Sequence, residues 1–123
     1  MGGERQPELV GVIVHTSEHG FLPMRRFYTE ILGLPARSDR AGFVNFEWKG
    51  FRLTLHLHDR VRGPSLEPDR VLLNFAVEDL AAWHERLSTA GTPCRRLPSP
   101  EPWGGLVATY SDPDANLVQL IQF

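Results

Sequence analysis

The pattern His56-x-His58 is the clearest arrangement of residues in this sequence that could perform chemistry. Side chains alternate between the two faces of a β-strand, so both imidazoles would share one face with Arg52 and Thr54. The other face would carry the intervening leucines, Leu53, Leu55 and Leu57. Divalent metals bind imidazole, thiolate and carboxylate, but no third ligand can be assigned here. Two other interpretations stay open: polar lining of a ligand pocket, and solvent-exposed histidines at a strand end.

Glu47 is the candidate general base, because it is the only acidic residue inside a segment expected to form a strand. His56 is the alternative base, and either group must lie within hydrogen-bonding reach of the proton that it removes. A glutamate at such a position more often simply faces water. The sequence shows no Ser/His/Asp triad and no phosphate-binding loop. Cys94, the only cysteine, has no base nearby in sequence and is assigned to packing.

The composition is typical of a soluble globular domain. Of the 123 residues, 41% are hydrophobic and 23% are charged, which favours one core. A net charge of −2 does not indicate the excess of basic residues that binds nucleic acid or anionic lipid. No apolar run approaches the roughly 18 residues that cross a bilayer, and nothing around Glu4 resembles a signal peptide. We therefore expect a cytoplasmic protein without nucleic-acid or membrane partners, and its single cysteine excludes an internal disulfide.

The first half of the chain predicts a β-α-β-β order. Residues 9–14 form a β-branched, uncharged run typical of a buried strand. From Pro23 to Leu32, apolar residues recur at the spacing of one helix face, and Gly33 is placed to end the helix. After a polar loop come two strand-like segments joined by a tight turn at Lys49-Gly50, at residues 43–48 and 51–58.

The second half repeats this order. Residues 59–70 are charged, contain two prolines and form a connector. Asp79 is a natural N-cap for a helix that Gly91 ends. Strands are expected at residues 71–77, 95–97, 106–110 and 117–123, with a turn at residues 112–115. Gly-x-Pro-x-Arg follows both helices, at residues 33–37 and 91–95, which indicates an internal duplication. We therefore predict one domain over residues 1–123, with modules at about 9–58 and 71–123.

Two motifs resemble the vicinal oxygen chelate superfamily, which includes glyoxalases, extradiol dioxygenases and bleomycin-resistance proteins. The first is Phe27-Tyr28-x-x-x-Leu32-Gly33-Leu34, at the end of the first helix. The second is Trp103-Gly104-Gly105 followed by Asp112-Pro113-Asp114-Ala115-Asn116-Leu117, with Ala115 in place of the usual glycine. The resemblance spans about residues 9–123. It implies an α+β fold in which two tandem βαβββ modules form a half-barrel sheet around a cavity.

The resemblance also implies where the metal enzymes of this superfamily hold their metal. Those positions carry Leu9, Thr54, Leu72 and Gln119 in this sequence. Leucine has no donor atom, a threonine hydroxyl is a poor ligand, and one glutamine carbonyl cannot hold a transition metal. We therefore expect no cofactor, as in the metal-free, bleomycin-resistance-like branch. A divalent metal on His56 and His58 is the alternative.

Strand alternation also predicts which side chains line the cavity. The helix-facing side is expected to carry Val10, Val12, Val14, Leu53, Leu55, Leu73, Phe75, Val118 and Leu120. The opposite side brings together Arg52, Thr54, His56, His58, Asn74 and Gln119, a polar set typical of a small-molecule site. A one-sided antiparallel sheet also permits a solvated face. Trp103 lies in a loop rich in proline and glycine, where it would either contact the ligand or plug the barrel mouth.

The function that these residues favour is metal-free binding, with an aromatic or antibiotic-like ligand that is sequestered or presented. The alternative is a lyase, isomerase or dioxygenase that uses His56 and His58 as metal ligands or Glu47 as general base. The resemblance further implies a homodimer, because members of this superfamily commonly build the cavity from modules of two chains.

Overall fold

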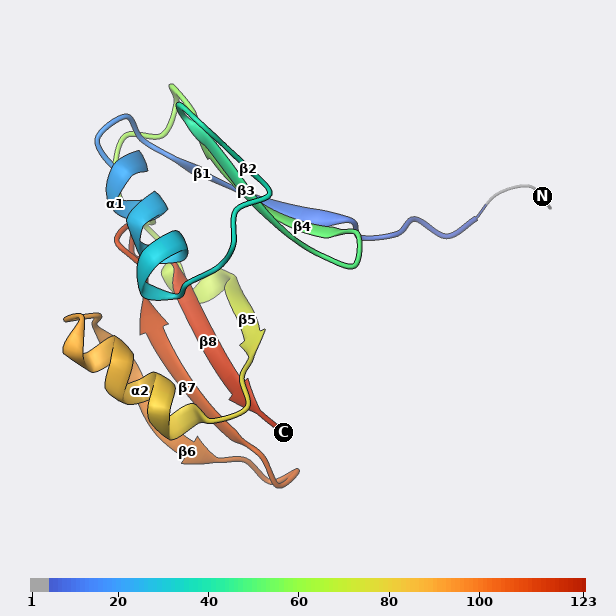
Figure 1. The fold of residues 1–123 in the computed structure, drawn as a ribbon, viewed down its shortest axis with the longest axis vertical. Coiled ribbons are helices and arrows are strands. Elements are labelled where there is room, and N and C mark those ends of the chain that lie inside the picture. The colour runs from blue at the N-terminus through green and yellow to red at the C-terminus, as the bar shows by residue number, and fades with distance from the viewer. Residues whose placement is uncertain (1–4) are drawn as a thin grey trace.

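Two four-stranded sheets form the framework of the molecule, as a computed structural model that describes residues 5–123 shows (Figure 1). Sheet A has the order β1-β4-β3-β2 and consists of β1 (Gly11–Thr16), β2 (Ser38–Arg40), β3 (Phe43–Trp48) and β4 (Phe51–Leu57). Sheet B repeats this order as β5-β8-β7-β6, with β5 (Leu72–Ala76), β6 (Cys94–Pro100), β7 (Leu106–Ser111) and β8 (Leu117–Gln122). The α+β fold of tandem βαβββ modules is confirmed. The expectation about a signal peptide around Glu4 falls mostly outside the described residues.

The helix of the first module begins slightly earlier than predicted and changes its hydrogen bonding midway. It runs as α1 (Phe21–Arg26) and continues as a π-helical turn, η1 (Phe27–Ile31). The wider turn is closed by the Leu32 N–H, which donates to the Phe27 carbonyl at 2.8 Å. Gly33 then adopts φ +71° and ends the helix, as its position predicts.

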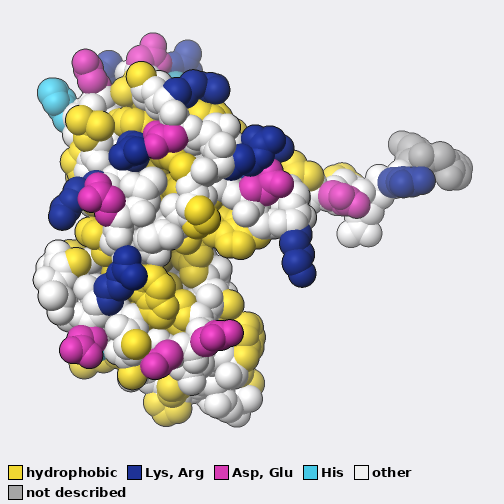
Figure 2. All heavy atoms as spheres, in the orientation of Figure 1, with side chains coloured by type: hydrophobic (Ala, Val, Ile, Leu, Met, Phe, Trp, Pro, Cys, Tyr) yellow, Lys and Arg dark blue, Asp and Glu magenta, His cyan; other side chains and the backbone are white. Residues whose placement is uncertain are grey.

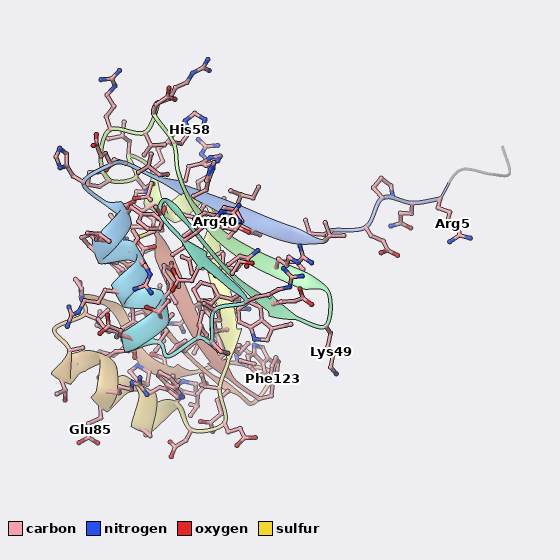
Figure 3. All side chains as sticks on the ribbon, turned by 45° about the horizontal axis from the view of Figure 1, so that its top comes forward. Arg5, Arg40, Lys49, His58, Glu85 and Phe123 are labelled. Carbon is pink, nitrogen blue, oxygen red and sulfur yellow. The ribbon has the colours of Figure 1, made fainter. Side chains whose placement is uncertain are left out.

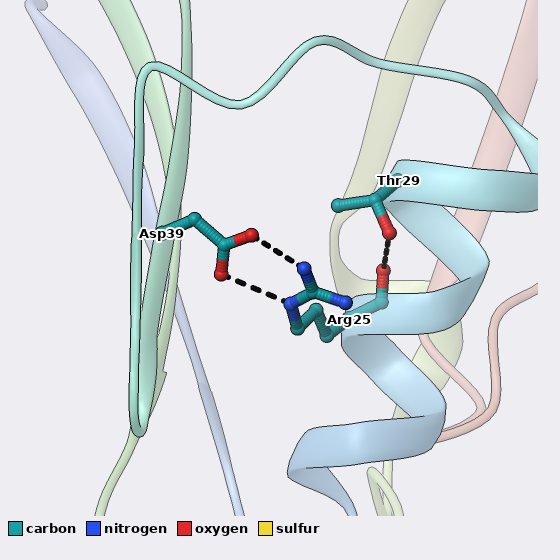
Figure 4. A network of polar contacts seen from close by, with 3 residues as sticks. All are labelled: Arg25, Thr29 and Asp39. Atoms are coloured by element: carbon teal, nitrogen blue, oxygen red, sulfur yellow. Dashed lines mark hydrogen bonds and ion pairs between the residues drawn. The ribbon is translucent and has the colours of Figure 1, made fainter.

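Strand bounds differ from the predictions at the edges of sheet A. β1 begins at Gly11 and extends to Thr16, so Val10 lies before the strand and is 67% exposed, contrary to the prediction that it faces the helices. β2 was expected as loop, because Ser38-Asp39-Arg40 has no apolar pattern. This short strand is tied to α1 by Arg25, whose guanidinium donates two hydrogen bonds to Asp39 (Figure 4).

The local signals of the second module are confirmed. Asp79 caps α2 (Leu80–Thr89), because its Oδ1 accepts a hydrogen bond from the Ala82 N–H at 3.1 Å. Gly91 follows the helix with φ +79°. The connector contains one 3₁₀ turn, η2 (Pro68–Arg70). β6 is longer than expected because prolines are tolerated in an edge strand, and Cys94 at its start is exposed and not packed as predicted.

One hydrophobic core contains side chains from both modules. The apolar sides of sheets A and B and of both helices all contribute to it. Apart from Val10, the residues predicted to face the helices belong to this core or pack against it: Val12, Val14, Leu53, Leu55, Leu73, Phe75, Val118 and Leu120. Phe46 shares this side and is buried, whereas Asn45 and Glu47 lie on the opposite side of β3.

Buried hydrogen bonds join the two motifs on which the family resemblance rests. The Tyr28 hydroxyl donates to Asp112 Oδ2 at 2.7 Å, and the Thr16 hydroxyl donates to Asp114 Oδ2 at 2.6 Å. Each bond links the first module to the turn between β7 and β8. The two motifs therefore form one contact between the modules.

Ala115 is strained in the turn between β7 and β8, because its φ of +65° lies in the left-handed region. Replacing Ala115 with glycine is expected to raise the free energy of unfolding by about 0.5 to 1 kcal/mol, since relief of this strain exceeds the extra entropy of the unfolded glycine. Chemical denaturation measures the change. The control is Ala82→Gly in α2, which lowers stability by a similar amount; a loss of stability in both variants would contradict the prediction.

Candidate functional site

A row of four side chains crosses all strands of sheet A on the side away from the core. The register pairs Arg40 with Phe43, Phe43 with His56, and His56 with His15. Directly paired residues of neighbouring strands lie on the same face, so β2, β3, β4 and β1 each contribute one member. His15 and His56 are exposed. We call this side of the sheet the polar face of sheet A.

Two further rows complete the polar face of sheet A. The middle row contains Ser38, Asn45, Thr54 and Ile13. In the last row Glu47 pairs with Arg52, and Glu47 Oε1 lies 2.9 Å from the Nε atoms of both Arg52 and Arg37. Two guanidinium groups therefore form ion pairs with the same carboxylate oxygen. This arrangement favours an ion-pair role for Glu47 over the general-base role that its position in the sequence allowed.

Sheet B carries a corresponding polar row. The row consists of Asn74 on β5, Gln119 on β8, Thr109 on β7 and Arg96 on β6, and each residue is paired with the next across neighbouring strands. The Gln119 amide donates to Asn74 Oδ1 at 3.1 Å. The predicted pocket residues thus fall into two groups, with Arg52, Thr54, His56 and His58 in the first module and Asn74 and Gln119 in the second.

The polar faces of the two sheets lie on the sides opposite the common core, and Asn45, Thr54 and Thr109 on these faces are nevertheless buried. They also carry apolar side chains in contact with water: Ile13 on β1 is 62% exposed and Leu72 on β5 is 40% exposed. β1 and β5 are edge strands, each paired on one side only. The polar row of each sheet therefore ends at an edge strand that is open on one side.

Three imidazoles from two segments meet at one end of the polar face of sheet A. The ring centroid of His15 lies 5.6 Å from that of His56 and 4.6 Å from that of His58. We call these residues the histidine cluster. Partial desolvation, followed by the charges of His58 and His56, lowers the pKa of His15 below its usual value of 6.5. Sequence reasoning missed His15 because the pairing of β1 with β4 is not local.

The residues at the family's metal positions do not fit a metal. Leu9 and Leu72 offer no donor atom, and Leu9 is 77% exposed before β1 begins. The Gln119 amide nitrogen donates to Asn74 Oδ1, which leaves the carbonyl oxygen as the one atom that Gln119 could offer a metal. Across residues 5–123, no group of three or more His, Cys, Asp or Glu side chains is arranged to hold a metal ion.

Trp103 lies in the second module, in the loop between β6 and β7, whereas the histidine cluster belongs to the first module. Its ring is 53% exposed and packs against Phe123, with 5.7 Å between the ring centroids. A Cβ atom at Gly105 would lie 1.9 Å from the Trp103 ring, so only glycine permits this position. The Trp-Gly-Gly sequence therefore serves to lay an aromatic ring at the end of sheet B.

A cavity of about 610 Å³ lies between the modules. It is lined mainly by apolar side chains, including Trp48, Leu53 and Phe75, and Asn74 is the single predicted pocket residue among them. Trp48 packs against Phe75 across it, with 6.0 Å between ring centroids. Figure 2 shows hydrophobic side chains that reach the surface where the upper and lower parts of the molecule meet. This cavity is an alternative place for an apolar ligand.

Comparison with known proteins identifies related sequences. The sequence profile described as the glyoxalase/bleomycin resistance protein/dioxygenase superfamily matches residues 23–120. A curated relative, the uncharacterized protein YraH of Bacillus subtilis (strain 168), is 32% identical over 106 residues, which cover 76% of this chain and 83% of YraH.

Among residues 5–123 we find no helix with the length and hydrophobicity needed to cross a membrane.

Solved structures share the fold at low sequence identity. A glyoxalase-related enzyme from Fulvimarina pelagi superposes with a TM-score of 0.76 at 20% identity, covering 96% of this chain and 89% of the enzyme. A lactoylglutathione lyase from Agrobacterium tumefaciens superposes with a TM-score of 0.71 at 16% identity, covering 96% of this chain and 95% of the lyase. At such identities these likenesses show a common fold and leave the reaction open.

Proposed function

Because the chain belongs to the glyoxalase/bleomycin resistance protein/dioxygenase superfamily, we propose that it is a metal-free protein that binds a small molecule on the polar faces of its sheets. The ligand class is aromatic or antibiotic-like, and the protein sequesters or presents it in the cytoplasm. The observation that carries this proposal is the pair of polar rows, one crossing each sheet. A few polar groups among apolar side chains are the usual composition of a ligand site.

A homodimer is part of the proposal, because each polar row forms a half-site that is open in the single chain. The exposed Ile13 and Leu72 flank the polar rows next to unpaired strand edges. Pairing β1 of one chain with β5 of its partner would cover both edges and bring a polar row of sheet A opposite one of sheet B. Two equivalent composite sites would result from one twofold axis.

The metal-free state is tested first, by calorimetric titration of chelator-treated protein with zinc, nickel, manganese and ferrous ions. We expect no stoichiometric tight binding, because two of the family's ligand positions are leucines without donor atoms and the other two offer only a threonine hydroxyl and a glutamine carbonyl. Stoichiometric binding that disappears in His56→Ala or His58→Ala would overturn the proposal. The protein would then be a lyase, isomerase or dioxygenase of this superfamily. The observation that favours this alternative is His15, because it places a further imidazole beside His56.

The place of the ligand is tested with two tryptophan variants. Trp103→Ala is expected to weaken binding of a compound found by screening aromatic molecules by about 1 to 3 kcal/mol, as for other buried aromatic contacts. Trp48→Ala is the matched control, because Trp48 is similarly exposed, at 42%, but lines the cavity between the modules. Calorimetry gives both affinities. Weakening by Trp48→Ala alone would place the ligand in that cavity and contradict the proposal.

A further inference from the structure

Basic side chains gather at the end of sheet A that holds the histidine cluster. In the row that crosses the sheet, the Arg40 guanidinium lies 4.1 Å from the centroid of the Phe43 ring, and this ring lies 5.9 Å from that of His56. Figure 3 shows His58 and Arg40 at the end of the sheet opposite the turn at Lys49. An arginine, an aromatic ring and three imidazoles are thus continuous across four strands.

A cavity of about 570 Å³ borders the histidine cluster through His15. The loop at residues 60–66 lines it, together with Asp114 and Asn116. Arg60 and Arg62 supply positive charge from this loop. Asp114 is the one acidic residue of the lining, and its Oδ2 is occupied by the Thr16 hydroxyl at 2.6 Å.

The charges around the cluster are mostly positive. The groups that surround it are Arg40 on β2, Asp59, Arg60 and Arg62 after β4, and Asp114 in the turn between β7 and β8. Asp59 lies 3.6 Å from His58 Nδ1, but its side chain is 95% exposed and is screened by water. The end of sheet A therefore attracts negative charge.

The hydrogen bonding of His58 favours a ligand that accepts hydrogen bonds. The Arg60 backbone N–H donates to His58 Nδ1 at 3.1 Å, so the proton of the neutral ring is on Nε2. A metal would need a lone pair on the same Nε2 atom. An oxygen anion instead accepts its N–H without any change of tautomer.

We propose that the histidine cluster and the adjoining cavity bind an oxyanion group of the small-molecule ligand, such as a carboxylate or sulfate. This inference rests on the proposed function and names the chemistry that one end of the site recognises. A bound anion favours the protonated form of His15, so binding takes up a proton and becomes tighter as the pH falls. Arg40 and the Phe43 ring would lie beside an aromatic group attached to the anion.

The test compares benzoate, sulfate and the neutral analogue benzamide by calorimetry at about pH 6 and about pH 8. Both anions keep their charge over this range, so a change in affinity reports on the protein. For benzoate we expect at least about tenfold tighter binding at the lower pH, with proton uptake revealed by two buffers of different ionisation enthalpy. Benzamide should bind more weakly and equally at both pH values. If sulfate binds with the same pH dependence as benzoate, the site takes free oxyanions. If benzoate binds more tightly than sulfate, the site takes an aromatic acid.

Histidine variants locate the effect. The double variant His15→Gln/His56→Gln should lose the pH dependence, and His19→Gln, an exposed histidine in the turn after β1, should keep it. Thermal unfolding verifies that both variants are folded. Benzoate and benzamide binding with equal affinity would overturn this inference and leave the proposed function intact. Absence of anion binding, or pH dependence that survives the double variant, would also overturn it. The proposed function is decided by other results: the metal titration, the tryptophan variants and the screen of aromatic molecules.

Discussion

Replacing Asp112 with alanine is expected to lower the free energy of unfolding by about 3 to 5 kcal/mol, the largest change that we predict for one substitution. Asp112 is 3% exposed, and its carboxylate accepts hydrogen bonds from the Tyr28 hydroxyl and from the backbone N–H groups of Asp114 and Asn116. Burial raises the pKa of this carboxyl, and the surrounding donors oppose that shift. Alanine would leave these three donors without a partner, and those of Tyr28 and Asp114 are buried.

Chemical denaturation monitored by tryptophan fluorescence measures this loss. Tyr28→Phe removes only the hydrogen bond from Tyr28 to Asp112 and should cost about 1 to 2 kcal/mol, which separates that bond from the bonds inside the turn. Asp59→Ala is the control, because the Asp59 side chain is 95% exposed and its removal should change stability by less than about 0.5 kcal/mol. A loss no larger in Asp112→Ala than in Asp59→Ala would show that the contact between the motifs is not stabilising.

Replacing Ile13 with glutamate is expected to convert the proposed dimer to a monomer that remains folded. Ile13 is 62% exposed in the single chain, so a charge there costs the protomer little. In the proposed dimer the same position would be covered by the partner, where an unpaired carboxylate is strongly unfavourable. We expect the dissociation constant to rise at least about a hundredfold, which corresponds to about 2.7 kcal/mol.

Light scattering at micromolar concentration measures the mass of the wild-type protein and the variant. Leu22→Glu is the matched control, because Leu22 is 72% exposed but lies on α1, outside the polar faces. It should remain dimeric. A monomeric wild-type protein, or an Ile13→Glu variant that keeps the mass of two chains, would contradict the proposed composite site. Calorimetry on the monomeric variant should also show lost ligand binding, because each half-site then lacks its counterpart.

Much of the fold could be predicted from local patterns. Alternation assigned Leu53 and Leu55 to the core, because the side-chain period of a strand is a property of the chain itself. Asp79 and Gly33 mark helix ends by their own hydrogen bonding and backbone conformation. The edge strand β2 was missed, because Ser38-Asp39-Arg40 is extended by its pairing with β3 and not by its own pattern.

The candidate site depended more on the tertiary structure. Sequence alone indicated that Thr54, His56 and Arg52 share a face, since they alternate on one strand. It did not indicate that His15 lies beside His56, because this contact comes from the parallel register of β1 with β4. Nor did it indicate the ion pairs of Glu47 with Arg37 and Arg52, which make a general base less favourable.

The sequence by itself therefore determined the elements, their repeat and the family, because periodicity, caps and turn residues act over a few neighbouring positions. Only the tertiary structure decided how strands pair and which way each sheet faces. Both sheets bury their apolar sides in one core, since that removes the most hydrophobic surface from water, and their polar rows consequently lie on the sides of the sheets away from that core. The division of the candidate site into two half-sites follows from this packing.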